Sequence, residues 1–340
     1  MGLFSSLFGK KGPKPAPPAE DPADAIDSAD GAERVDALRA LVERWRSGEV
    51  QAAELIAPRL PDLLEDPEPL VRATALSAVR LLQEPETLQK CESAVLALLA
   101  DPVPRVRTAA IWAAMRFPGE AARTQVRAAL GSTEESMRFA AACALAEAQD
   151  SAALPELLAA LRDDHRRQEA ISALMALGDA AAAPELGKLL EEESVGDFDR
   201  TLAAAALARF GDARGTAHLI SRIEMDGDDR PVATEWAGRL GVHDAIPVLT
   251  ELAETEGAVA RGAAMRALGR LKAVGAEERL LRIAVDPAAP DDLRLDAAEG
   301  LAELGTPAAL DQLRQLSAEG PEELRQLCQE LLVEVQANAG

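Results

Sequence analysis

The side chains that most often carry out chemistry are few in this 340-residue chain, and they form no recognised site. Its histidines and cysteines stand far apart in sequence: His165, His218, His243, Cys91, Cys143 and Cys328. This spacing gives neither a disulfide framework nor a Cys-x-x-Cys metal or redox motif. The chain also lacks a glycine-rich phosphate loop and a Gly-x-Ser-x-Gly nucleophile elbow. We therefore expect no catalytic residue, no metal and no cofactor.

Two acidic clusters are the nearest approach to a cation site. One comprises residues 191–193 with Asp197 and Asp199, and the other comprises residues 226–229. The second superficially resembles a calcium loop, but position twelve of that loop is Ala237 and not the glutamate that such a loop needs. We interpret both clusters as solvated turns.

The overall charge is strongly negative and restricts the choice of partners. The chain has 58 acidic and 36 basic residues, which give a net charge of -22. Such a surface repels phosphate backbones, so nucleic acid is disfavoured and a basic protein partner is favoured. No run of eighteen apolar residues exists that could span a membrane, and the N-terminus does not resemble a signal peptide. We expect a reducing, cytoplasmic setting, and the alanine- and arginine-rich composition suggests a bacterium.

The N-terminal segment differs from the rest. Residues 1–9 form a short apolar hook that contains Phe4 and Phe8, and residues 10–32 contain five prolines and are expected to be a disordered linker. Three lysines lie within residues 10–14. Three interpretations stay open: a peptide that docks on a protein partner, a weak membrane contact through residues 1–14, or no function.

The remaining chain is built from a repeat of about 31 residues. An arginine is followed three residues later by a small residue and seven residues later by an apolar one, which places all three on one helix face. Ten arginines begin such a pattern: Arg34, Arg72, Arg107, Arg138, Arg167, Arg200, Arg230, Arg261, Arg294 and Arg325.

Each repeat contains a second apolar segment after a breaker. Gly178 and Gly305 mark helix ends, and Pro155, Pro184 and Pro247 fall in the first turn of the second segment. There is no period-2 pattern typical of strands. Each unit is therefore predicted to be helix, tight turn, helix.

Residues 66–75 and 101–110 carry the pattern D-P-x-x-x-V-R-x-x-A. In this the chain resembles the HEAT repeat family, and in particular the short HEAT-like repeats of the phycobilin-lyase type. The resemblance implies an all-α, right-handed solenoid of about nine helical hairpins over residues 33–337, closed by a capping helix at 322–335.

The resemblance also implies a role for the arginines. In such repeats the arginine pairs with acidic residues of the turns, so Arg138, Arg167 and Arg200 are expected to pair with Asp150, Asp179 and Asp212. The whole ladder, which includes Arg72, Arg107, Arg230, Arg261 and Arg294, is then structural and does not bind phosphate.

Two enzyme classes with HEAT-like repeats are weighed against this sequence. HEAT-repeat hydroxylases with a di-iron site use repeated His-Glu pairs, but the three histidines here precede Arg166, Leu219 and Asp244. HEAT-like DNA glycosylases present a basic face. The outward positions of the second helices here are mixed in sign, and we take them as candidate partner-binding residues: Glu156, Glu185, Lys188, His218, Arg279 and Arg282.

The tryptophans depart from the repeat. Trp112 lies five residues after Arg107, a position that is polar or charged in several other repeats, so it should be partly exposed. It is either an interface anchor or covered by a neighbouring loop. Trp236 replaces an alanine of the close-packed face, and it either fills a gap between repeats or bends the row.

These observations favour a non-catalytic cytoplasmic scaffold or adaptor that binds protein partners, basic or extended ones in particular. The alternative is an accessory subunit or enzyme of the chromophore-lyase type. A concave pocket with converging polar groups would separate the two functions.

Overall fold

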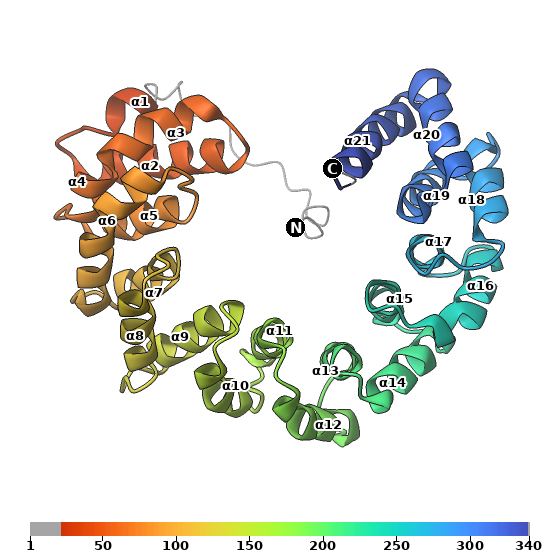
Figure 1. Ribbon diagram of the computed structural model, residues 1–340, viewed down its shortest axis with the longest axis horizontal. Coiled ribbons are helices and arrows are strands. Elements are labelled where there is room, and N and C mark those ends of the chain that lie inside the picture. The colour runs from red at the N-terminus through yellow and green to blue at the C-terminus, as the bar shows by residue number, and fades with distance from the viewer. Residues whose placement is uncertain (1–21, 339–340) are drawn as a thin grey trace, which may run out of the picture. The chain divides into compact units, whose positions relative to one another are not determined.

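The structure is a computed structural model that describes residues 22–338 (Figure 1). The hook with Phe4 and Phe8 and residues 10–21 of the linker lie outside the described residues. Over residues 22–338 the chain forms α-helices and short 3₁₀ helices and no strand. No helix of this part of the chain is long and apolar enough to cross a membrane.

The prediction that residues 10–32 form a disordered linker is wrong for residues 22–32. Helix α1 (Pro22–Ala25) is followed by Ile26, which is 1% exposed, and Asp27 accepts a hydrogen bond from Arg59 at 2.9 Å. Asp30 then caps the next helix by accepting from the Ala32 N–H. Four of the five prolines of residues 10–32 lie before residue 22, and the buried Ile26 together with these polar contacts joins residues 22–32 to the first hairpin.

The chain divides into two compact units that meet within one helix, α9 (Glu135–Glu147). Unit 1 ends at Ala144 and contains α1, α2 (Gly31–Arg46), α3 (Val50–Ile56), η1 (Ala57–Arg59), α4 (Leu60–Leu64), α5 (Pro69–Val79), α6 (Pro85–Ala97), η2 (Leu98–Ala100), α7 (Pro104–Ala114) and α8 (Glu120–Ala129).

Unit 2 begins at Leu145 and continues the same alternation of helices. It contains η3 (Ser151–Ala153), α10 (Leu154–Ala160), α11 (Arg167–Leu177), η4 (Ala180–Ala182), α12 (Ala183–Glu191), α13 (Asp197–Arg209), α14 (Ala213–Glu224), α15 (Arg230–Arg239), η5 (His243–Ala245), α16 (Ile246–Glu254), α17 (Arg261–Arg270), α18 (Ala276–Val285), α19 (Asp291–Leu304), α20 (Pro307–Glu319) and α21 (Glu322–Asn338).

Each hairpin has a first helix, which carries the repeat arginine, and a second helix. Within unit 2 the first helices α11, α13, α15, α17 and α19 form one row and the second helices form another (Figure 1). First helices pack on the first helices of neighbouring hairpins, as α17 does on α15 and α19. The all-α repeat fold expected from the sequence is confirmed.

The repeat pattern marks the core. All ten residues at the third place after the repeat arginine are buried, from Ala37 to Cys328, and all but Leu332 at the seventh place are buried too. Small residues let neighbouring first helices approach closely. An added Cβ at Gly269 on α17 would lie 2.2 Å from the carbonyl oxygen of Gly300 on α19.

The turns follow the predicted signals. Gly178 and Gly305 end α11 and α19 with φ values of 71° and 67°, a left-handed conformation that glycine adopts without strain. Pro155, Pro184 and Pro247 lie in the first turns of α10, α12 and α16. These caps fix the angle at which each second helix folds back.

Candidate functional site

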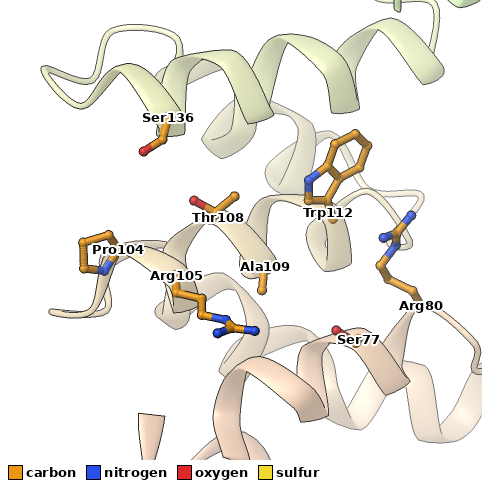
Figure 2. Close-up of a pocket in the computed structure, with 8 residues that line it drawn as sticks. All are labelled: Ser77, Arg80, Pro104, Arg105, Thr108, Ala109, Trp112 and Ser136. Carbon is orange, nitrogen blue, oxygen red and sulfur yellow. The ribbon is translucent and has the colours of Figure 1, made fainter. Parts of the chain in front are cut away.

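A shallow groove of about 480 Å³ crosses the first helices of unit 1 (Figure 2). Most of its lining comes from α7, with additions from the end of α5 and the start of α9: Ser77, Arg80, Pro104, Arg105, Thr108, Ala109, Trp112 and Ser136. Trp112 is partly exposed in it, as the sequence predicted. Its role as an interface anchor stays a prediction.

The lining from α7 lies along one face of the helix. Arg105, Thr108, Ala109 and Trp112 have the spacing i, i+3, i+4 and i+7, which brings them into line over two turns. The opposite face of α7 carries Val106, Ala110 and Ile111, each fully buried. The core therefore holds α7 rigidly while its outer face remains open.

The groove is positively charged, although the chain as a whole is acidic. The Arg80 guanidinium carbon lies 5.2 Å from the centre of the Trp112 ring, a cation–π contact. Arg105 is exposed, and within residues 22–338 neither arginine has a carboxylate partner. None of the eight lining residues is acidic. Sequence reasoning found Trp112 but missed both arginines, which carry no repeat signature.

On three first helices of unit 2, the repeat place that Trp112 fills is charged and forms ion pairs. Its occupants on α15, α17 and α19 are Glu235, Arg266 and Glu299. Arg270 on α17 donates to Glu235 at 2.5 Å and to Glu303 at 2.7 Å, so it bridges the helices on either side. Burial alone would raise the pKa of Glu235, but hydrogen bonds from Arg270 and Arg239 outweigh it and lower the pKa.

The predicted outward residues of the second helices do not converge on a pocket. Glu185 and Lys188 pair with each other at 2.5 Å on α12, and the pKa of Glu185 is lowered by that hydrogen bond. Arg279 on α18 pairs with Glu254 at 2.5 Å, while Arg282 is exposed. Glu156 on α10 is partly exposed. These residues are spread over α10–α18, and their role in partner binding stays a prediction.

His218 belongs to a buried charged cluster instead. Asp229, which is 3% exposed, accepts hydrogen bonds from Arg222 at 2.7 Å and from the Thr201 hydroxyl at 2.6 Å. Burial and the nearby Arg222 and Arg200 charges lower the pKa of His218, and its Nε2 is buried without a hydrogen-bond partner among the described residues.

The interpretation of the two acidic clusters as solvated turns is wrong for one residue in each. Asp199 is 9% exposed and accepts from Arg167 at 3.1 Å and Gln168 at 2.8 Å. Asp229 has the corresponding place, directly before the next repeat arginine. Each carboxylate receives donors from the preceding hairpin, so it links two hairpins.

The arginine ladder has a different set of partners from the expected one. Arg72 pairs with Asp101 of the next hairpin at 2.8 Å and also donates to the Asp66 carbonyl at 2.8 Å. Asp101 in turn offers its own carbonyl to Arg107, which pairs with Glu134. The aspartate of the D-P-x-x-x-V-R pattern thus joins successive repeats through both its side chain and its backbone.

The prediction that Arg167 pairs with Asp179, and Arg200 with Asp212, is wrong. Arg167 pairs with Asp199 and with Asp164, and Arg200 pairs with Asp197. Asp179 and Asp212 instead cap η4 and α14 by accepting backbone N–H groups. Asp150 likewise accepts from the Ala152 N–H, and Arg138 donates to the Ser132 carbonyl at 3.0 Å.

The remaining ladder arginines are held by backbone oxygens. Arg230, Arg261 and Arg294 donate to the carbonyls of Ile223, Ala253 and Ala284, each at the end of the preceding second helix. Because these carbonyls belong to the last turn of a helix, they accept no hydrogen bond from within that helix. Such contacts favour a structural role for the ladder over phosphate binding.

The three cysteines lie inside the fold. Cys91, Cys143 and Cys328 are all buried, and burial raises the pKa of Cys91 and Cys328 to about 11. Over the described part of the chain, no three metal-ligating side chains come together.

Comparison with known families identifies the repeat. The family model for HEAT repeats matches residues 56–141, 92–175, 125–208 and 246–332. The chain therefore belongs to the HEAT repeat family. No curated protein sequence matches it significantly.

Solved structures with similar helical repeats include human deoxyhypusine hydroxylase in complex with glycerol. It is 20% identical, the match covers 72% of this chain and 96% of that chain, and the TM-score is 0.30. The CpcE–CpcF complex of phycocyanin lyase from Nostoc has 24% identity, coverage of 63% and 94%, and a TM-score of 0.39. A homology model of the full-length AP-3 complex has 13% identity, coverage of 93% and 68%, and a TM-score of 0.47. At TM-scores below 0.5 we draw no functional conclusion from them.

Proposed function

We propose that this chain is a non-catalytic scaffold or adaptor of the cytoplasm that binds protein partners through the faces of its helical repeats. The observation that carries the proposal is the groove on α7, where a partly exposed Trp112 stands on a rigid helix between two arginines. Tryptophan and arginine are the residues most enriched among energetic anchors of protein interfaces.

The chemistry of the groove supports binding over catalysis. Its hydroxyl groups come from Ser77, Thr108 and Ser136, and no histidine, aspartate or glutamate lines it to act as a general base. The Ser77 hydroxyl donates to the Ala73 carbonyl at 3.3 Å within α5. The groove therefore offers an aromatic face, two cations and hydroxyl donors, which are groups that recognise and do not transform a partner.

Unit 2 supports a second contact with a basic partner. Residues 145–340 have 37 acidic and 19 basic residues, a net charge of -18, against -5 for residues 22–144. The outward residues of the second helices and the N-terminal hook belong to the same proposal. A long row of faces and a tethered hook would let one partner be held at more than one point.

Affinity capture with the full chain tests the proposal. We expect Trp112→Ala to lose a partner that the parent captures from a lysate of the source organism, while circular dichroism and the thermal midpoint show an intact fold. Trp236→Phe is the matched control, because Trp236 is also a partly exposed tryptophan of a first helix. Equal capture by Trp112→Ala and the parent would contradict the proposal.

A further inference from the structure

The groove on α7 is selective for the charge of its occupant. Arg80 and Arg105 lack carboxylate partners among the described residues, while the lining contains no acid. Anionic groups of a partner would therefore meet two cations, neither of which has to leave an ion pair first. We propose that this groove binds an acidic, extended segment of a partner protein in the polyproline II conformation, an inference that rests on the scaffold function proposed above.

The length of the groove sets the length of the segment. The lining runs along α7 from Pro104 to Trp112, which corresponds to about 12 Å at 1.5 Å per residue. An extended chain that advances about 3 Å per residue covers this distance with about four residues.

The spacing of the two recognition groups sets the sequence pattern. Arg105 and Trp112 are seven residues apart on one face, so their Cα atoms are separated by about 10.5 Å along the helix axis. A polyproline II segment repeats every three residues, or about 9.3 Å, and thus places residues i and i+3 on the same side. In a β-strand those two residues point to opposite sides. The occupant therefore has an anionic residue three positions from an apolar one.

Proline is the best apolar residue for the position on Trp112. The flat face of the indole ring packs against a pyrrolidine ring, and proline fixes the backbone in advance, which lowers the entropy lost on binding. The backbone of such a segment has no internal hydrogen bonds. Thr108 lies between Arg105 and Trp112 along α7, and its hydroxyl, which points toward the side of Ser136 in Figure 2, supplies a donor for one of the segment's carbonyls.

Selection from a random ten-residue peptide library against the full-length protein tests this inference. The expected consensus is an acidic residue three positions from a proline or aromatic residue. A labelled copy of the selected peptide should bind about tenfold more weakly to Arg105→Glu, because a charge-assisted contact is lost. A peptide with lysine in place of its acid should regain binding to Arg105→Glu.

Further arms complete the test. Arg123→Glu, a charge reversal outside the groove, should leave peptide binding unchanged. A phosphoserine copy of the peptide shows whether carboxylate or phosphate is the preferred anion; binding of either through Arg105 supports the inference. A basic or uncharged consensus, no selected peptide, or binding that ignores both Arg105→Glu and Trp112→Ala would overturn it.

The inference and the proposed function fail separately. If Trp112→Ala loses a captured partner but the selected peptides are not acidic, the scaffold function stands and the charge selectivity is wrong. If acidic peptides bind the groove but capture of partners does not depend on Trp112, the proposed use of the groove is wrong.

Discussion

The fifth place after the repeat arginine has opposite chemistry on α7 of unit 1 and on α15, α17 and α19 of unit 2. On α7 it holds Trp112, next to arginines without carboxylate partners among the described residues. On α15, α17 and α19 it holds Glu235, Arg266 and Glu299, which are joined by ion pairs between helices. The buried pattern of the repeat fixes the third and seventh places and leaves the fifth free. One framework can therefore support a binding surface in one unit and an ion-pair network in the other.

The largest expected effect tests whether the two units share the same framework. Leu76→Ala in α5 and Leu268→Ala in α17 each remove a buried side chain that is at most 1% exposed. Each should lower the free energy of unfolding by about 2–5 kcal/mol, measured by urea titration, because the cavity cannot be filled by rigid neighbours. A small loss in only one unit would show that the repeat is not packed alike in both.

The next effect separates the two kinds of arginine. Arg270→Ala should lower the free energy of unfolding by about 1–3 kcal/mol, because it leaves the half-buried Glu235 without its main donor. Arg80→Ala, which removes an exposed guanidinium, should change it by about 0.5 kcal/mol or less. If both variants lost the same free energy of unfolding, Arg270 could not be called structural and Arg80 could not be called available for binding.

A pH titration probes the buried cluster of unit 2. The folded state lowers the pKa of His218, so the folded protein binds fewer protons than the unfolded chain. Stability should be complete above about pH 6.5 and should fall as the pH drops from there through the lowered pKa. Four charged groups act on this histidine: Arg200, Arg222, Asp197 and Asp229.

The control variants for that titration are His218→Gln and His165→Gln. His218→Gln should remove the loss of stability between pH 7 and pH 5, whereas His165→Gln, at an exposed site, should retain it. Below that window a second loss is expected. Burial alone would raise the pKa of Asp229, but hydrogen bonds from Arg222 and Thr201 lower it, so its stabilisation is lost only as pH falls below about 4. A loss above pH 5 that persists in His218→Gln would contradict this assignment.

The fold was predictable because the repeat is a local signal. The arginine, the small residue and the apolar residue recur at fixed spacing on one helix face, and the small and apolar residues mark its buried part. The ladder partners were not predictable from the same signal, because Arg72 reaches Asp101, 29 residues away in the next hairpin. Which acid a long side chain meets depends on how the hairpins stack.

The groove was only partly predictable for the same reason. Trp112 stands out because its repeat place is polar or charged in several other repeats. Arg80 and Arg105 become part of a site only because the end of α5 packs beside α7. Residues 22–32 show the reverse case: composition indicated a linker, but the buried Ile26, the hydrogen bond from Arg59 to Asp27 and the Asp30 cap join this stretch to the first hairpin.

The most direct test of the account measures partner affinity and the free energy of unfolding together for Trp112→Ala and Arg270→Ala. We predict that Trp112→Ala weakens partner binding by about 2 kcal/mol or more, as interface tryptophans commonly do, and changes stability by about 1 kcal/mol at most. Arg270→Ala should do the opposite, with stability lowered and affinity retained. If Arg270→Ala weakens partner binding and Trp112→Ala does not, the assignment of binding to Trp112 in unit 1 and of stabilisation to Arg270 in unit 2 is wrong.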